Sequence, residues 1–202
     1  MKKNLLALLA LALAAAAAPA RAQAVFPPPP EAPALTGPYV GAGFGFAQAK
    51  PGCVGFIRFT ASCDDTDFTW ALLAGYQLSR YFGAEAEYRD LGYVTGRDFN
   101  VSRTVHASAW DAAVIGFLPF SNRFSAFGKF GAYRALLEAT GAPIADQHHT
   151  GATYGAGLQW DFARQASGRL QWQRYRQVNG GDRDFGSNDY DTLSAVLIWR
   201  LR

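Results

Sequence analysis

The sequence predicts an all-β fold: an eight-stranded antiparallel up-and-down barrel that crosses a membrane, with short turns at one rim and long loops at the other. Three observations lead to this prediction. Apolar and polar residues alternate with a period of two from residue 38 onward, which is the pattern of strands with two unlike faces. The segments between these strands are alternately short and long. A leader at the start of the chain indicates export.

The first 22 residues have the three parts of a secretory signal peptide. Two lysines precede an uninterrupted apolar run from Leu5 to Ala18, and the small-x-small triplet Ala20-Arg21-Ala22 follows. The run is shorter than the ~20 residues of a typical membrane-spanning helix. We therefore expect cleavage before Gln23 rather than a retained membrane anchor.

The rest of the chain divides into a proline-rich segment and one long domain. Residues 23–36 favour an extended polyproline conformation and are expected to form a periplasmic linker or tail, and residues 37–202 are expected to form the barrel. The chain has 19 basic and 16 acidic residues, but Lys2, Lys3 and Arg21 leave with the leader, so the mature charges balance. A nucleic-acid partner would require an excess of positive charge, and we expect none.

The first four predicted strands place apolar residues at alternate positions. In residues 39–48 phenylalanine and alanine alternate with glycine, and in residues 67–78 aromatic residues and leucine alternate with threonine, glycine and glutamine. Residues 81–91 carry glutamate and arginine on the other face, and residues 104–118 carry an aspartate there. Such alternation predicts strands with one apolar and one polar face.

The last four predicted strands repeat this pattern. Residues 123–137 alternate phenylalanine and alanine with a lysine and a tyrosine. Residues 152–162 alternate aromatic and small apolar residues with glycine, glutamine and aspartate. Residues 168–178 set leucine and tryptophan against arginine, glutamine and tyrosine, and residues 191–201 set leucine, alanine and tryptophan against serine and arginine.

The connections between the predicted strands distinguish a barrel from a sandwich. Three are short, at residues 79–80, 119–122 and 163–166, and four are long, at residues 49–66, 92–103, about 137–150 and about 179–188. Short periplasmic turns and long extracellular loops are typical of bacterial outer-membrane barrels. A soluble β-sandwich that buries its apolar faces is the alternative, but the leader and the rim asymmetry favour the barrel.

The two predicted faces carry different side chains. Aromatic residues near the strand ends of the apolar faces are typical of the two interfacial girdles of such barrels, namely Tyr76, Phe82, Phe124, Tyr154, Trp160, Phe162, Trp172 and Trp199. The opposite faces hold charges of both signs, namely Glu85, Glu87, Arg89, Asp111, Lys129 and Arg169. Since side chains just fill an eight-stranded barrel, we expect these charges to pair as a luminal network that fixes the packing. A narrow gated path is the alternative.

Four stretches resemble the strand patterns of the OmpA/OmpX-type small outer-membrane barrels, which include porin-family and outer-membrane β-barrel domain proteins: GPYVGAGFGFA, FGAEAEYRDLGY, LPFSNRFSAFGKFGAYRA and TYGAGLQWDF. The resemblance covers residues 37–202. It implies a multi-pass barrel in the outer membrane of a Gram-negative bacterium, contact with outer-membrane lipid and lipopolysaccharide, and insertion by the barrel assembly machinery. This group usually ends on an aromatic residue, whereas this chain ends in IWRLR, so Trp199 or Leu201 would take that place.

The resemblance implies a structural and surface-interaction role: envelope integrity, and adhesion through loops that contact an extracellular surface ligand. The alternatives are a channel for ions or small solutes and, with less support, a lipid A-modifying enzyme. His106-Ala107-Ser108 has the His-x-Ser spacing of the outer-membrane lipid A deacylase, which pairs a serine nucleophile with a histidine base and an acid. However, Phe120 stands where the acid is expected, and Asp111 lies on the opposite face. We therefore expect no enzyme and regard His106 as a rim residue.

The only two cysteines, Cys53 and Cys63, lie in the first long loop of an exported chain, so we expect a disulfide between them. A rigid loop loses less entropy on binding, which makes this loop the best candidate for surface recognition; protection against proteolysis is the alternative. His148-His149 and Asp146 lack a convincing third and fourth ligand for a metal ion. We expect no metal and no cofactor.

Overall fold

The computed structural model describes residues 36–50, 62–98, 101–140, 147–178 and 189–201. Within these residues it contains nine strands: β1 (Gly37–Lys50), β2 (Ser62–Asp64), β3 (Thr66–Gln77), β4 (Phe82–Asp98), β5 (Val101–Pro119), β6 (Phe124–Thr140), β7 (Gln147–Asp161), β8 (Ala166–Tyr175) and β9 (Asp189–Arg200). In this part of the chain no helix is long and apolar enough to cross a membrane. The expected leader, the proline-rich segment and Cys53 lie outside the described residues.

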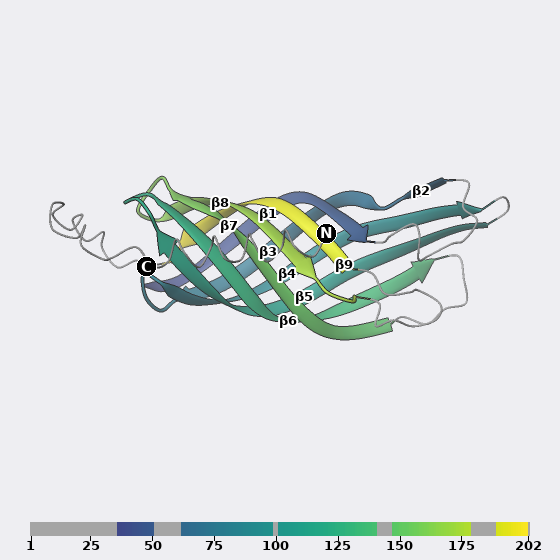
Figure 1. The fold of residues 1–202 in the computed structure, drawn as a ribbon, viewed down its shortest axis with the longest axis horizontal. Coiled ribbons are helices and arrows are strands. Elements are labelled where there is room, and N and C mark those ends of the chain that lie inside the picture. The colour runs from purple at the N-terminus through teal and green to yellow at the C-terminus, as the bar shows by residue number, and fades with distance from the viewer. Residues whose placement is uncertain (1–35, 51–61, 99–100, 141–146, 179–188, 202) are drawn as a thin grey trace, which may run out of the picture. The chain divides into compact units, whose positions relative to one another are not determined.

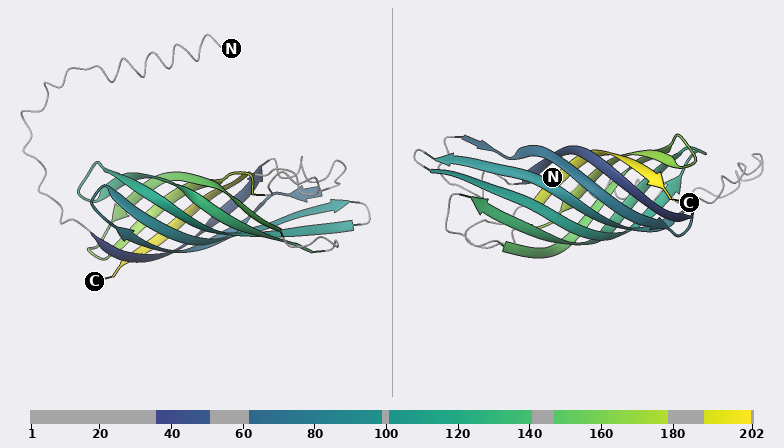
Figure 2. Two further views of the ribbon diagram at one scale, coloured as in Figure 1. Left: turned by 90° about the horizontal axis from the view of Figure 1, so that it is seen from below. Right: turned by 180° about the vertical axis from the view of Figure 1, so that it is seen from behind.

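The strands form one closed antiparallel barrel (Figures 1 and 2). β1 pairs with β3, each strand from β3 onward pairs with the next along the chain, and β1 also pairs with β9, from Tyr39 opposite Arg200 to Lys50 opposite Asp189. The short β2 and the longer β3 both pair with β4 and together form one barrel strand that is interrupted at Asp65. This confirms the predicted eight-stranded up-and-down barrel.

Two of the long loops predicted from the sequence are largely strand. Residues 92–98 continue β4, residues 101–103 begin β5, and the two strands remain paired as far as Asp98 opposite Val101. The strands of the next hairpin likewise reach Thr140 and Gln147. The prediction was wrong here because it followed the alternation of hydrophobicity. Beyond the membrane, backbone hydrogen bonds still pair these strands, but neither face of the sheet has to be apolar, so the alternation is lost. Figure 2 shows the β4–β5 hairpin extending beyond most other strands at the long-loop end of the barrel.

A bulge in β4 lies where this hairpin begins to project. The register with β5 shifts between Asp90 and Gly92, so that Leu91 is the extra residue. Gly92 has a φ of 78°, a left-handed conformation that glycine adopts without steric cost. The Asp90 carboxylate accepts a hydrogen bond from the Gly92 amide at 2.8 Å. Bulges of this kind bend a strand and increase its twist.

Apart from the bulge in β4, side chains alternate between the outside of the barrel and its lumen. The burial pattern of β9, for example, alternates buried and exposed positions along the strand. Large exposed side chains such as Phe44, Leu118 and Trp199 belong to the outward set. An outward face with this much apolar area suits lipid rather than water.

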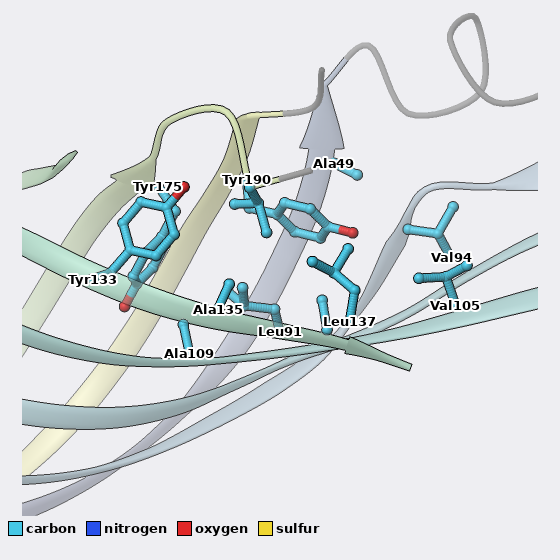
Figure 3. Packing of buried hydrophobic residues seen from close by; sticks show 12 residues of the cluster. Ala49, Leu91, Val94, Val105, Ala109, Tyr133, Ala135, Leu137, Tyr175 and Tyr190 are labelled. Carbon is cyan, nitrogen blue, oxygen red and sulfur yellow. The ribbon is translucent and has the colours of Figure 1, made fainter. Parts of the chain in front are cut away.

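The lumen is filled by three layers of side chains. A short-turn apolar layer contains Tyr39, Leu73, Ile115, Phe117, Phe127, Val196 and Ile198. Charged and amide side chains form the middle layer, because along the same strands they lie between the short-turn apolar residues and those near the long loops. A long-loop apolar layer closes the other end (Figure 3), with Ala49, Leu91, Val94, Val105, Ala107, Ala109, Tyr133, Ala135, Leu137, Tyr175, Val178 and Tyr190.

Two inward tyrosines cover glycines on the neighbouring strand. Tyr39 lies directly opposite Gly75, and Tyr133 lies directly opposite Gly151. A Cβ atom added to Gly75 would lie 2.4 Å from the Tyr39 ring, and one added to Gly151 would lie 2.7 Å from the Tyr133 hydroxyl. Both glycines therefore provide the space in which an aromatic ring lies flat against the barrel wall.

Candidate functional site

The six charged residues that the alternation places on polar faces come together in the middle of the lumen. We call them the luminal charge cluster. They come from β4, β5, β6 and β8, and each residue is at most 4% exposed: Glu85, Glu87, Arg89, Asp111, Lys129 and Arg169. Three are acidic and three are basic, so the cluster is balanced in charge. Charges buried in this way require partners.

Lys129 lies at the centre of this cluster. Its Nζ atom donates to Glu87 Oε2 at 2.8 Å and lies 4.0 Å from both Glu85 Oε2 and Asp111 Oδ1. Those last two oxygens have no hydrogen-bond partner within the described part of the chain. One ammonium group therefore lies within 4.0 Å of all three carboxylates of the cluster.

Two arginines complete the ion pairs. The Arg89 guanidinium contacts Glu87 Oε1 at 2.5 Å, and Arg169 Nη1 contacts Glu85 Oε1 at 2.6 Å. Arg169 also donates to Gln159 at 3.0 Å, and its guanidinium carbon lies 4.7 Å from the centroid of the Phe127 ring. Arg169 therefore joins the charged layer to the short-turn apolar layer.

Neutral side chains satisfy much of the remaining polar surface of the cluster. The Tyr39 hydroxyl donates to Glu85 at 2.6 Å. Asp111 Oδ2 accepts from the Tyr175 hydroxyl at 2.7 Å and from Gln173 Nε2 at 3.0 Å. Gln171 donates to Gln173 at 2.8 Å. The network predicted from the sequence contained only charged residues, so it left out these neutral partners. They could have been found, because they occupy the same polar faces of their strands as the charged residues.

The long-loop apolar layer lies next to the luminal charge cluster, on the side of the long loops. The hydroxyl of Tyr175 reaches down to Asp111, and its ring meets that of Tyr133 edge-on, with 5.3 Å between centroids. Figure 3 shows the tyrosines and aliphatic side chains of this layer converging from several strands. An ion that crossed the lumen would lose its hydration here, with tyrosine hydroxyls as the polar side-chain groups of this layer.

Most of the aromatic residues expected in the girdles lie on the outward face near the short turns: Tyr76, Phe82, Phe124, Trp160, Phe162 and Trp199 are all exposed. Tyr154 lies in the middle of β7, because β7 continues past the apolar band, whereas Trp172 lies three residues before the end of β8. They contact each other with 5.9 Å between centroids.

A second set of outward aromatic residues was only partly anticipated. Trp70, Tyr88 and Trp110 lie on three adjacent strands, with centroid distances of 5.4 Å and 4.9 Å between successive rings. Together with Tyr154 and Trp172 they form what we call the upper aromatic ring. The upper aromatic ring and the aromatic residues near the short turns would mark the two edges of the apolar band that faces lipid.

His106 and Ser108 do not form a catalytic pair. Both lie on the outward face of β5, but the His106 ring holds carboxylates on both nitrogens: Asp90 lies 3.1 Å from Nε2 and Glu138 lies 3.2 Å from Nδ1. The ring also stacks on Tyr93, with 4.7 Å between centroids. Acids are therefore present beside His106, contrary to the expectation from sequence, but they leave neither ring nitrogen to activate Ser108.

His148 and His149 are consecutive residues of β7, not residues of a loop, so they point to opposite faces. Asp146 lies outside the described residues. Across the described strands no group of three histidine, cysteine, aspartate or glutamate side chains is arranged to hold a metal ion. The expected disulfide cannot be placed because Cys53 falls in an undescribed range, although β2 places the Cys63 backbone opposite Gly96 of β4.

Comparison with known proteins places this geometry among outer-membrane barrels. The profile of a family described as outer membrane protein beta-barrel domain matches residues 6–200. Neisserial surface protein A has a TM-score of 0.54 and 13% identity, over 81% of this chain and 97% of that one. No protein of curated function matches the chain in sequence.

Two further solved structures share the fold. The N-terminal barrel domain of OprF from Pseudomonas aeruginosa has a TM-score of 0.50 and 14% identity, over 81% of this chain and 99% of that one. Ail, the attachment invasion locus protein of Yersinia pestis, has a TM-score of 0.50 and 14% identity, over 82% and 99%. Identities this low establish the fold alone.

Proposed function

The chain belongs to the outer membrane protein beta-barrel domain family, and from this premise we propose that it is a non-conducting structural barrel whose projecting hairpins contact surfaces outside the cell. The barrel crosses the outer membrane of a Gram-negative bacterium, with its short turns in the periplasm and its long loops outside.

The filled lumen is the observation that carries the non-conducting part of the proposal. All six members of the luminal charge cluster are buried and their charges balance. An ion on its way through would have to break the contact between Lys129 and Glu87 and then cross the long-loop apolar layer, whose twelve residues are at most 3% exposed. Breaking a buried pair leaves an uncompensated charge and is strongly unfavourable.

The projecting hairpin supports a surface role. From Tyr88 in the upper aromatic ring, β4 continues to Asp98, which is about 30 Å along the strand at ~3.3 Å per residue. It stays paired with β5 throughout, and β2 adds a third strand at its edge. A paired sheet projects farther and loses less entropy on contact than an unstructured loop of the same length.

Planar-bilayer conductance tests the closed lumen. The chain without residues 1–22, refolded and checked by the gel mobility difference between unheated and boiled samples, is expected to give no openings. Lys129→Met, which unbalances the cluster, is compared with Lys50→Met, which removes the same charge from an exposed outward position. Reproducible openings of the wild type that change in Lys129→Met but not in Lys50→Met would replace the proposal with a gated channel.

Shortening the β4–β5 hairpin tests the surface role. Replacing residues 95–104 by Asn-Gly, a dipeptide that suits a two-residue hairpin turn, removes the projecting part beyond Val94 and Val105. Cells that express this variant at wild-type level are expected to adhere less to polystyrene and to epithelial monolayers. Unchanged adhesion on both surfaces would exclude this hairpin as the contact.

The enzyme alternative has its own test. Expression of the chain is expected to leave the mass spectrum of lipid A unchanged, because His106 and Ser108 are not paired.

A further inference from the structure

The outward face of the barrel changes character just beyond the upper aromatic ring. On β4, Asp90 follows Tyr88 at the next outward position, and on β8, Arg174 follows Trp172. Other outward positions toward the extracellular rim carry Gln48, Lys50, Thr66, His106, Ser108, Arg134, Glu138, His148, Thr150 and Asp191, with Phe68, Tyr93 and Leu136 between them. We call these polar residues the polar belt. It lies at the depth of the outer-leaflet headgroups, since aromatic rings mark the membrane boundary.

Most cations of the polar belt already have a carboxylate partner. Arg174 holds Asp191 through two hydrogen bonds of 2.5 and 2.6 Å, and Lys50 lies 3.1 Å from the same carboxylate. His106 lies between Asp90 and Glu138. The carboxylates of Asp90 and Glu138 are therefore both engaged with His106.

Arg134 differs from these residues. Its side chain is exposed on the outward face of β6, directly opposite Trp110 on β5 and Thr150 on β7. Among the described residues it has no ion-pair partner. An arginine on the lipid-facing side of a barrel is least unfavourable near the membrane interface, where a headgroup anion is able to pair with it.

A hollow beside Arg134 provides further contacts. Its volume is 380 Å³, and its lining combines aromatic and polar side chains from four strands: Tyr88, Ser108, Trp110, Arg134, Ala135, Leu136 and His148. The Ser108 hydroxyl and the His148 imidazole are both able to donate hydrogen bonds. The aromatic rings lie on the membrane side of the hollow, where acyl chains begin.

We propose that Arg134, beside the polar side chains that line this hollow, binds a phosphate group of lipid A in the outer leaflet. The planar guanidinium donates two parallel hydrogen bonds to a phosphate, an arrangement that lysine does not reproduce. Phosphate is the anion that lipid A presents at this depth, and the acyl chains of the same molecule would lie against Tyr88 and Trp110. This inference rests on the outer-membrane location and is independent of whether the lumen conducts.

Binding of purified lipid A to the folded barrel in detergent micelles, counted by native mass spectrometry, tests the site. The wild type is expected to retain bisphosphorylated lipid A and to release lipid A from which both phosphates have been removed. Arg134→Gln should weaken retention about tenfold, in line with the loss of a charge-assisted contact, and Arg134→Lys should restore part of it. Arg123→Gln removes the same charge from an exposed periplasmic turn and should bind as the wild type does.

Several results would overturn the proposal. Arg134→Gln with wild-type retention would exclude the site, and an equal loss in Arg123→Gln would show a nonspecific charge effect. Equal retention of dephosphorylated lipid A would exclude phosphate recognition, and displacement of lipid A by millimolar inorganic phosphate would indicate a site for a free anion. All variants are first checked by gel mobility, which is expected to be unchanged because Arg134 and Arg123 are exposed.

Discussion

The barrel holds two sets of ion pairs that use the same residue types in different surroundings. In the lumen, Lys129 and Glu87 meet with no exposed side-chain surface. On the outside, Arg174 and Asp191 meet with 29% and 12% of their side chains exposed, and Lys50 beside them is half exposed. Buried charges must be matched because nothing else replaces water, whereas exposed pairs contribute little because solvent screens them. The same chemistry should therefore be essential inside and nearly dispensable outside.

Removal of Lys129 should have the largest effect. Lys129→Met leaves Glu85, Glu87 and Asp111 without their shared ammonium group, and breaking a buried pair costs about 3–5 kcal/mol. Urea unfolding in lipid vesicles, followed by tryptophan fluorescence, should show the lower midpoint. Adding Asp111→Asn should recover part of the loss, because Lys129 is the one cation within 4.0 Å of that carboxylate among the described residues, whereas Glu87 also pairs with Arg89. An unchanged midpoint in Lys129→Met would contradict the central role of this residue.

A side chain at Gly75 should have the next largest effect. Gly75→Ala places a Cβ atom 2.4 Å from the Tyr39 ring and should displace that ring and its hydrogen bond to Glu85, with a loss of about 1–3 kcal/mol. Gly116→Ala is the matched control, since its added Cβ meets nothing closer than 3.9 Å. Equal unfolding midpoints for the two variants would argue against the packing of Tyr39 on Gly75.

Loss of the Tyr175 hydroxyl should have a smaller effect. Tyr175→Phe keeps the ring against Tyr133 but removes the hydrogen bond to Asp111, which Gln173 still contacts. The expected loss is about 1 kcal/mol, the typical value of one hydrogen bond, measured by the same unfolding experiment. If Tyr175→Phe proved as harmful as Lys129→Met, the layers of the lumen would act as one cooperative unit.

Loss of the outer pair should have the smallest effect. Asp191→Asn breaks the contacts to Arg174 and Lys50, and partly exposed pairs contribute about 0–1 kcal/mol. The small change in midpoint should fade further in 1 M salt, where the screening length is ~3 Å. A loss above that of Tyr175→Phe would mean that exposure is a poor guide to the importance of a charge in this barrel.

The fold class was predictable because the signal is local. A period of two in the printed sequence is enough to identify strands and to separate their faces, and alternating short and long connections indicate an up-and-down order. The same alternation assigned Glu87 and Lys129 to polar faces, and the structure buries both. The extended ends of β4, β5, β6 and β7 could not be found in this way, because outside the lipid neither face has to be apolar and the alternation fades.

The sequence by itself determined which residues of the regular strands face the lumen and which face the lipid, since that choice depends on parity along each strand. Only the structure revealed the bulge at Leu91 that shifts this parity in β4. Only the tertiary structure decided which of them meet. Lys129 and Glu87 are 42 residues apart, and Arg169 and Glu85 are 84 apart. Such contacts depend on the register of every strand between them, and a shift of one residue reverses the faces of a whole strand. The place of Arg134 opposite Trp110 of the upper aromatic ring depends on that register in the same way.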